Sequence, residues 1–163
     1  MLDLARAENG RMYFHLETIV LNELLTEIEG IVNQYETPID FSVPDGLFKV
    51  KGDKNRLKEL FLKLIDNAVK YSHSPEPILV KLSQEKQGAK IEVCDRGVGI
   101  ALTHQTRIFE RFYRVDEARS RNVGGTGLGL SIVKTLVEGM GGTIKVISQP
   151  NQGTTFTIVF PLS

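Results

Sequence analysis

Two glycine-rich segments constrain this 163-residue chain more than any other feature of its sequence. The first is Asp95-Arg96-Gly97-Val98-Gly99-Ile100, which directly follows the apolar, strand-like run Ile91–Val93. A carboxylate in that place can accept a hydrogen bond from a ligand, and alternate glycines let the bare backbone approach the ligand closely. This segment is therefore a candidate ligand-binding turn at the end of a strand.

The second segment is Gly124-Gly125-Thr126-Gly127-Leu128-Gly129-Leu130-Ser131, a glycine loop that opens an apolar helix expected over 130–140. Exposed N–H groups and the positive end of a helix dipole make such a loop a phosphate site. The two segments together indicate a nucleotide. The spacing fits neither the dinucleotide nor the P-loop pattern, because no Gly-Lys-Ser/Thr ending is present and the loop follows a polar stretch. A turn and a helix cap alone would also explain the glycines.

A third signal is a helix expected from Asn55 to Tyr71. Its apolar residues recur at intervals of three and four and predict one buried stripe: Leu57, Leu60, Phe61, Leu64, Ile65 and Ala68. Lys63, Asn67 and Lys70 project together beside that stripe. One asparagine oxygen plus nucleotide phosphates is a plausible magnesium shell, because magnesium prefers oxygen ligands and keeps several waters. A solvated face with ordinary surface lysines is the alternative.

A fourth segment, residues 107–114, alternates aromatic side chains with arginines before the polar stretch 115–123. Arginine supplies forked donors that suit phosphate, and the aromatic rings can anchor a neighbouring loop to the body of the protein. A short surface helix with Phe109 and Phe112 in the core would give the same pattern. Both interpretations can hold at once.

The order of the segments is more specific than any one of them. They resemble, in sequence and spacing, the N, G1, F and G2 boxes of the sensor histidine kinase catalytic domain: Asn67-Ala68-Val69-Lys70-Tyr71, Asp95-x-Gly97-x-Gly99, Phe109-Glu110-Arg111-Phe112-Tyr113 and Gly125-Thr126-Gly127-Leu128-Gly129-Leu130. That domain belongs to the ATPase superfamily shared with gyrase, Hsp90 and MutL. The resemblance extends from about Leu21 to Pro161.

The fold class expected is α+β. Helices near 21–35, 55–72 and 130–140 mix without regular alternation with strands near 39–43, 48–51, 78–83, 89–94, 143–148 and 154–161. The resemblance implies a two-layer α/β sandwich of the Bergerat ATP-binding type, with a mixed, mostly antiparallel sheet covered on one face by helices. Residues 1–12 resemble the remnant of a preceding dimerisation helix and linker, and the resemblance implies that residues 13–163 form the ATP-binding catalytic domain.

Composition agrees with one soluble domain. Hydrophobic residues make up 41% and charged residues 25%, and the formal charge is zero with 20 basic and 20 acidic side chains. Apart from the short segment 107–114, the sequence has no stripe of basic residues interleaved with aromatic ones, so nucleic acid is not expected as a partner. The single Cys94 excludes an internal disulfide, suits a reducing compartment and is expected to be a small buried side chain. No signal peptide or transmembrane run is present, so we expect a cytoplasmic domain without membrane contact, whose parent carries any anchor elsewhere.

The resemblance assigns the adenine pocket to five residues. Asp95 would accept the adenine amino group and thereby select ATP over GTP. Gly97 and Gly99 would let the base lie against the backbone, and Tyr71 and Ile100 would form walls of the pocket.

It also assigns the phosphate site. Asn67 would hold Mg²⁺, Lys70 would neutralise phosphate charge, and Arg111 and Arg114 are the candidates for the γ-phosphate, with Arg114 the safer choice because it ends the Phe-Tyr-Arg string. A loop would supply the hinge and the phosphate contacts: Gly125, Thr126, Gly127, Leu128 and Gly129. The stretch 115–126, rich in charged and small residues, is expected to be its lid.

The function implied is transfer of the γ-phosphoryl group of Mg-ATP to a histidine on a separate dimerisation and phosphoacceptor domain, in two-component signal transduction. A response regulator would be an indirect partner, and the chain alone is expected to be monomeric. The family's His-Glu-Leu/Phe-Arg-Thr-Pro string is absent, so His15, His73 and His104 are expected to be surface or packing residues.

Two departures from the family pattern stand out. Lys63 occupies the position, one turn before Asn67, where the family usually has asparagine and ATP-hydrolysing relatives tend to have a catalytic glutamate. A lysine cannot serve as that base at neutral pH, so gyrase-like hydrolysis is disfavoured. Ala101 replaces a common proline. A serine-directed kinase of the anti-sigma type and a non-catalytic ATP-binding module remain alternatives.

Overall fold

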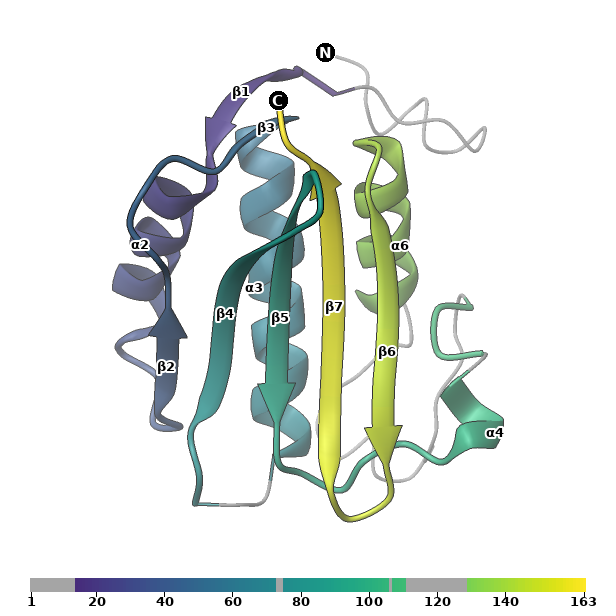
Figure 1. Cartoon of the computed structure of the whole chain (residues 1–163). Helices are drawn as coiled ribbons and strands as arrows, with labels where there is room; N and C mark the ends of the chain where they lie inside the picture. The colour runs from purple at the N-terminus through teal and green to yellow at the C-terminus, as the bar shows by residue number, and fades with distance from the viewer. Residues whose placement is uncertain (1–13, 73–74, 106, 111–128) are drawn as a thin grey trace.

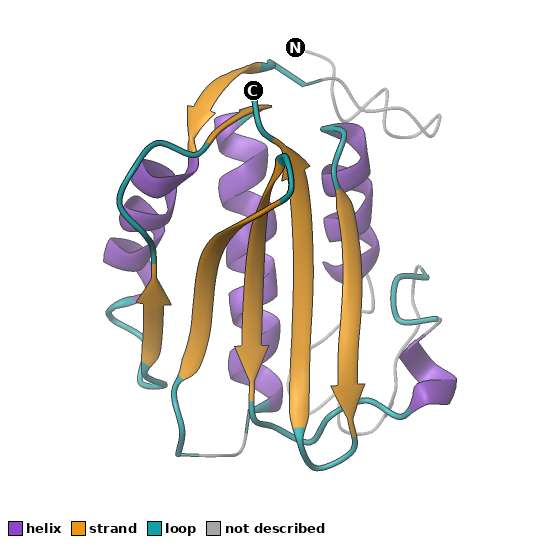
Figure 2. Cartoon of the chain, in the orientation of Figure 1, coloured by secondary structure: helices purple, strands orange, loops and turns teal. Residues whose placement is uncertain are grey.

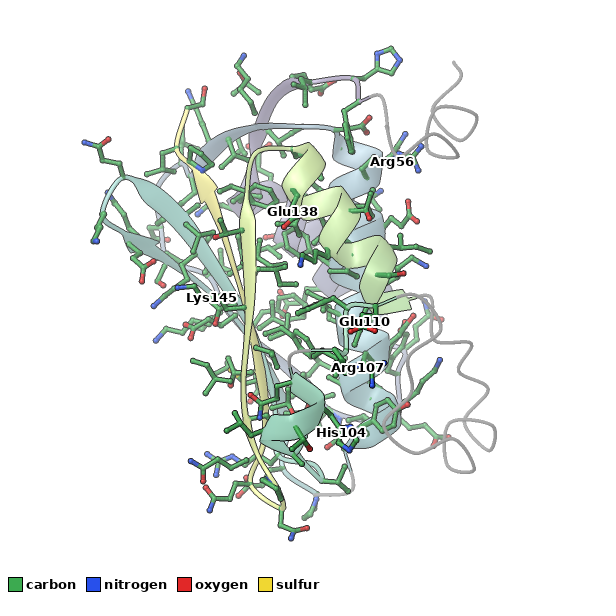
Figure 3. The ribbon with its side chains drawn as sticks, turned by 90° about the vertical axis from the view of Figure 1, so that its right-hand side faces the viewer. Arg56, His104, Arg107, Glu110, Glu138 and Lys145 are labelled. Atoms are coloured by element: carbon green, nitrogen blue, oxygen red, sulfur yellow. The ribbon has the colours of Figure 1, made fainter. Side chains whose placement is uncertain are left out.

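A computed structural model describes residues 14–72, 75–105, 107–110 and 129–163 of the chain. Its two main layers are a five-stranded sheet and three helices, which cover one face of the sheet (Figures 1 and 2). The helices are α2 (Leu21–Val32), α3 (Lys54–Tyr71) and α6 (Gly129–Gly139). In the side view, α3 and α6 both lie to one side of the strands (Figure 3). The expected two-layer α+β fold is confirmed.

The sheet has the order β2-β4-β5-β7-β6. Its strands are β2 (Ile39–Ser42), β4 (Ile78–Glu85), β5 (Gly88–Asp95), β6 (Thr143–Gln149) and β7 (Gly153–Pro161). Only β2 and β4 are parallel, and the other neighbours are antiparallel. A separate antiparallel pair, β1 (Glu17–Val20) and β3 (Lys49–Gly52), lies near the C-terminus (Figure 1). The mixed, mostly antiparallel sheet is thus as expected.

The core lies between the sheet and the helices. Strand residues that face the helices are buried, whereas those on the other face are half-buried or exposed. Cys94 belongs to the outer face and is half-buried, and this burial raises the pKa of its thiol. It is therefore not the buried core side chain that its apolar strand indicated, because the alternation of β5 directs it away from the helices.

Helix α3 is the central element of the helical layer. All six residues of its predicted stripe are buried. Its first turn is capped by Asp53, whose carboxylate accepts hydrogen bonds from the backbone N–H groups of Asn55 (3.1 Å) and Arg56 (3.3 Å). Such a cap stabilises a helix by about 0.5–2 kcal/mol.

Two local expectations need correction. The helix expected over 21–35 ends at Val32, because the chain turns there and brings Tyr35 toward α3. The Tyr35 hydroxyl donates a hydrogen bond of 2.7 Å to Asp66 Oδ1. His104, expected in a loop, lies in the short helix α4 (Leu102–Gln105), whose backbone N–H groups at His104 and Gln105 donate to the Ala101 carbonyl.

The bond between Tyr35 and Asp66 predicts a pH dependence. Hydrogen bonding to Asp66, followed by burial, raises the pKa of Tyr35 from 10.0 to about 12. Because the folded pKa lies above the unfolded one, the contribution to stability is complete below about pH 10 and is lost as pH rises toward 12. The difference in free energy of unfolding between wild type and Tyr35→Phe should therefore shrink across that window, as measured by urea denaturation.

A spectroscopic titration checks the cause. A late ionisation step should be seen when tyrosinate absorbance is followed, and that step should disappear in Tyr35→Phe. In Asp66→Asn it should move toward the ordinary value. An unchanged late step in Asp66→Asn would show that the aspartate is not the cause.

Candidate functional site

The candidate site is built around Asp95, the last residue of β5. Its side chain is only 8% exposed, and Oδ1 accepts a hydrogen bond of 2.8 Å from the Gly97 N–H. Burial raises the pKa of this carboxyl, while backbone hydrogen bonds from Gly97 and Thr154 oppose the rise. A carboxylate has about four acceptor positions. Asp95 therefore keeps the capacity to accept a further hydrogen bond from a ligand.

The loop after Asp95 is packed tightly between two other backbone segments. A Cβ atom at Gly97 would lie 2.1 Å from the Tyr71 carbonyl oxygen, at the end of α3. Gly99 has φ +74°, and a Cβ there would lie 2.0 Å from the Gln149 carbonyl oxygen, at the end of β6. Both glycines permit a close approach to the protein's own backbone, so packing alone requires them. Their proposed contact with a base stays a prediction.

The last two turns of α3 form one side of the site. Asn67 and Tyr71 are half-buried and Lys70 is exposed. Lys58, which projects from the side of α3 opposite Asn67, forms an ion pair with Glu27 of α2. Asn67 therefore lies on the side of α3 away from this ion pair with α2. Helix α6 packs against α3 on the flank opposite α2 (Figure 1). Within the described parts of the chain, its amide has no hydrogen-bond partner.

Lys63 lies one turn before Asn67 on the same side of α3 and is half-buried. The structure thus keeps Lys63, Asn67 and Lys70 on one stripe of the helix, as their spacing predicted. This stripe ends beside the loop of Asp95, since Tyr71 contacts Gly97.

Ile100 closes the glycine loop and is half-buried against the core. Its N–H donates a hydrogen bond of 2.7 Å to the Ser148 hydroxyl. Its carbonyl accepts one of 2.7 Å from Gln105 Nε2, and the same amide donates to the Ser148 carbonyl at 2.9 Å. The wall that Ile100 forms is therefore fastened to α4 and to β6.

Much of the expected phosphate site lies outside the described residues. This holds for Arg111 and Arg114, for the loop residues Gly125, Thr126, Gly127 and Leu128, and for the expected lid over 115–126. Gly129 is described and begins α6. It is exposed, and a Cβ atom there would meet nothing within 4 Å. Packing therefore does not explain a glycine at this helix start.

The segment before the undescribed stretch is held by apolar contacts. Ile108 is buried, and the half-buried Phe109 packs edge-on against Phe156 with ring centroids 6.2 Å apart. Lys134 Nζ of α6 lies 5.8 Å from the Phe109 ring centroid, within the range of a cation–π contact. Phe109 thus anchors this segment, as expected, whereas Phe112 lies outside the described residues.

Three polar residues of this region were missed by sequence reasoning: Gln105, Ser148 and Thr154. Ser148 and Thr154 occupy helix-facing positions of β6 and β7, because Thr154 alternates with the buried residues Phe156, Ile158 and Phe160. A polar residue in an otherwise apolar alternation was a usable signal for Thr154. One of the two partners of Gln105, the Ser148 carbonyl, is 43 residues away, and no local pattern indicates it.

The two described histidines lie on different parts of the chain. His15 is exposed, and its backbone N–H donates to Asp53 Oδ2 at the far end of α3. His104 is half-buried in α4, and His73 lies outside the described residues. Within the described ranges, no group of three or more His, Cys, Asp or Glu side chains could hold a metal ion. No helix among those ranges is long and apolar enough to cross a membrane.

The chain is similar in sequence to ATPase domains and to histidine kinases. The profile of a family described as "Histidine kinase-, DNA gyrase B-, and HSP90-like ATPase" matches residues 52–163. The chain is 37% identical to the sensor-like histidine kinase SenX3 of Mycolicibacterium smegmatis, over 99% of its own length and 43% of that protein. It therefore spans less than half of this relative.

Solved structures give the same result. A mycobacterial sensor histidine kinase, MprB, superimposes with a TM-score of 0.75 at 31% identity, covering 90% of this chain and 97% of that one. Full-length ShkA in complex with AMPPNP gives a TM-score of 0.80 at 27% identity, covering 99% of this chain and 35% of that one. The sheet and helices that hold Asp95 are thus shared with these proteins.

The glycine contacts around Asp95 predict unequal effects of adding one methyl group. Gly97→Ala and Gly99→Ala should each lower the free energy of unfolding by more than about 1 kcal/mol, because the new Cβ would overlap backbone oxygens. The matched control is Gly30→Ala in α2, where nothing lies within 4 Å, and there stability should stay equal or rise. Urea denaturation measures all three. Equal effects at the three sites would contradict the packing described.

Proposed function

Because this chain belongs to the family of histidine kinase-, DNA gyrase B- and HSP90-like ATPases, we propose that it binds Mg-ATP and donates the γ-phosphoryl group to a histidine. That histidine would lie on a separate dimerisation and phosphoacceptor domain, in two-component signal transduction. The observation that carries the proposal is Asp95, a buried carboxylate with free acceptor capacity at a glycine loop. The active molecule is then a protein histidine kinase, of which this chain is the catalytic domain.

The adenine site follows from the polarity of Asp95. An acceptor that is almost fully buried favours a ligand that presents a donor, as the adenine amino group does. Guanine presents a carbonyl oxygen at the equivalent position, and two acceptors facing each other in a desolvated site are unfavourable. Gly97 and Gly99 hold the loop against its neighbours, and Tyr71 and Ile100 supply half-buried walls. The site should therefore select ATP over GTP.

The phosphate end fits a magnesium ion held partly by the substrate. The amide of Asn67, without a hydrogen-bond partner among the described residues, offers one hard oxygen, and the same residues supply no acidic cluster to complete a shell. Magnesium commonly takes its remaining ligands from phosphates and water. When bound, it neutralises phosphate charge and orients the γ-phosphoryl group.

The remaining phosphate contacts are assigned by position in the chain. Lys70 would neutralise charge beside Asn67. Arg111 and Arg114 would contact the γ-phosphate, and Gly129 would open the helix whose N–H groups face it. The loop residues complete the set: Gly125, Thr126, Gly127 and Leu128. These assignments rest on the family boxes rather than on described contacts.

The chemistry asks little of this domain beyond positioning. Phosphoryl transfer depends mainly on alignment and charge neutralisation, so the nucleophile can lie on another domain. Lys63, half-buried one turn before Asn67, places an amine where a carboxylate would be needed to activate water. Transfer to histidine is therefore favoured over hydrolysis, with Lys63 placed to attract phosphate.

The similar proteins support a kinase that acts on histidine. SenX3 and MprB are named as sensor histidine kinases, and ShkA was solved with AMPPNP. These names favour this function over a serine-directed kinase or a non-catalytic module. The acceptor domain, a response regulator and any membrane anchor would belong to the rest of the parent protein, with this chain in the cytoplasm and monomeric when isolated.

Substitution of Asp95 tests the adenine assignment. Asp95→Asn replaces one acceptor oxygen by a donor, and the affinity for Mg-ATP should fall by about tenfold or more. The matched control is Asp40→Asn, an exposed aspartate of β2, which should leave affinity unchanged. Calorimetry with ATP and GTP measures both variants. Undiminished ATP affinity in Asp95→Asn, or tight GTP binding by the wild type, would contradict the assignment.

Phosphotransfer tests the enzymatic function. Incubated alone with labelled ATP, the chain should not form acid-labile phosphohistidine, whereas an added phosphoacceptor domain from its parent should become labelled. Asn67→Ala should abolish this labelling by removing the metal ligand, and Asn33→Ala, an exposed residue after α2, should not. Label on His15, His73 or His104 of the chain itself would overturn the proposal of a separate acceptor.

A further inference from the structure

A row of polar side chains crosses the helix-covered face of the sheet at its Asp95 end. Asp95 of β5 pairs with Thr154 of β7, and Thr154 pairs with Ser148 of β6. Thr154 is buried, and its hydroxyl oxygen lies 2.8 Å from that of Ser148. Across the strands, the carboxylate assigned to adenine is thus next to the Thr154 hydroxyl, and the Ser148 hydroxyl comes after it. The proposed adenine site assigns neither hydroxyl group a part in recognising the ligand.

The partners of Ser148 fix the direction of this hydrogen bond. The Ile100 N–H donates to Ser148 Oγ at 2.7 Å, and Ser148 Oγ donates to the Gly153 carbonyl at 2.9 Å. A serine hydroxyl has one proton and two lone pairs. Since a carbonyl can only accept, the serine proton is committed to Gly153. The arrangement that satisfies all three contacts of Ser148 therefore has Thr154 donating its proton to Ser148, whose capacity is then complete.

This direction determines what Thr154 can offer to a ligand. With its only proton committed to Ser148, the Thr154 hydroxyl keeps acceptor capacity alone. Its lateral neighbour Asp95 is an acceptor as well. The corner formed by the two residues therefore presents oxygen lone pairs only, and it suits a group that donates hydrogen bonds.

We propose that Ser148 is a positioning residue that fixes the Thr154 hydroxyl as an acceptor and thereby sharpens discrimination between adenine and guanine. The inference rests on the proposed ATP site and adds a specificity determinant outside the four sequence boxes. Without the Ser148 hydroxyl, Thr154 can turn its proton toward the ligand and satisfy the guanine carbonyl oxygen. The buried corner then no longer rejects a ligand acceptor.

Gln105 has a separable role at the same place. Its amide donates to the carbonyls of Ile100 and Ser148, at 2.7 and 2.9 Å, and so fastens the Ile100 wall to β6. Figure 1 shows α4 beside the end of β6, and Figure 3 labels His104 on that helix. None of these bonds involves a hydroxyl proton. Loss of Gln105 should loosen the wall without changing the polarity of the Thr154 corner.

The experiment compares the affinities of Mg-ATP and Mg-GTP by calorimetry in the whole chain and five variants. Ser148→Ala removes the hydroxyl, and Ser148→Cys keeps the side-chain volume with only a weakly hydrogen-bonding thiol. Ser148→Thr retains the hydroxyl as the conservative rescue. Gln105→Ala tests the wall, and Ser83→Ala on the outer face of β4 is the control. Thermal melting confirms that each variant is folded.

The expected result is a change in ratio rather than in affinity alone. The preference for ATP over GTP should fall about tenfold in Ser148→Ala and Ser148→Cys, and it should be largely restored in Ser148→Thr. Gln105→Ala should weaken both nucleotides together, and Ser83→Ala should match the wild type. Absence of ATP binding by the folded wild type would refute the proposed function itself. A wild-type ratio in a folded Ser148→Cys, or the same change in Gln105→Ala, would overturn the role of Ser148 alone.

Discussion

Close contact between three backbone segments is the constraint on which the rest of the site depends. The loop after Asp95 lies between the end of α3 and the β6–β7 turn, and glycines remove the side chains that would separate them. Gly153, with φ +103°, belongs to the same contact, because a Cβ there would lie 2.1 Å from the Asp95 carbonyl oxygen. The Asn151 N–H then donates to the Val98 carbonyl at 2.6 Å. Backbone N–H groups rather than long side chains hold the Asp95 carboxylate in place.

That rigidity has an electrostatic consequence. Burial raises the pKa of Asp95, and backbone N–H groups offset part of this cost without supplying a counter-charge. A mobile carboxylate could recover its hydration by turning toward water, whereas a fixed one keeps its unused lone pairs directed into the site. Desolvation raises the free-energy cost of leaving an acceptor without a hydrogen bond, and a ligand that brings no donor causes that loss. The proposed selectivity for a nucleobase therefore depends on the packing of the glycine loop, because this packing holds the Asp95 carboxylate in a desolvated place.

The periodicity of apolar residues predicted the features that it physically controls, namely which elements form and which of their faces are buried. The stripe of α3 and the hairpin of β6 and β7 follow from spacing within one element, and both lie where the sequence indicated. The Asp95 turn was also recognisable, because a carboxylate and alternate glycines occupy six consecutive residues. The bond from Gln105 to Ser148 spans 43 residues and depends on sheet order, which periodicity does not encode. The same reason hid the pairing of β1 with β3, although a strand near 48–51 was expected.

Helix α3 connects this site to the N-terminal segment. At its first turn, Asp53 Oδ2 accepts a hydrogen bond from the His15 N–H (2.9 Å), and the Asp53 N–H donates to Met140 Sδ (3.4 Å). The Phe14 ring lies where a Cβ atom at Gly139 would otherwise be. The incoming chain is thus clamped between α3 and the end of α6, about 27 Å along the 18-residue helix from Tyr71. An internally hydrogen-bonded helix hardly changes length. A displacement of the chain at His15 must therefore either be absorbed at the Asp53 contacts or shift α3 as a whole. A shift of α3 would reach the backbone contact between Tyr71 and Gly97.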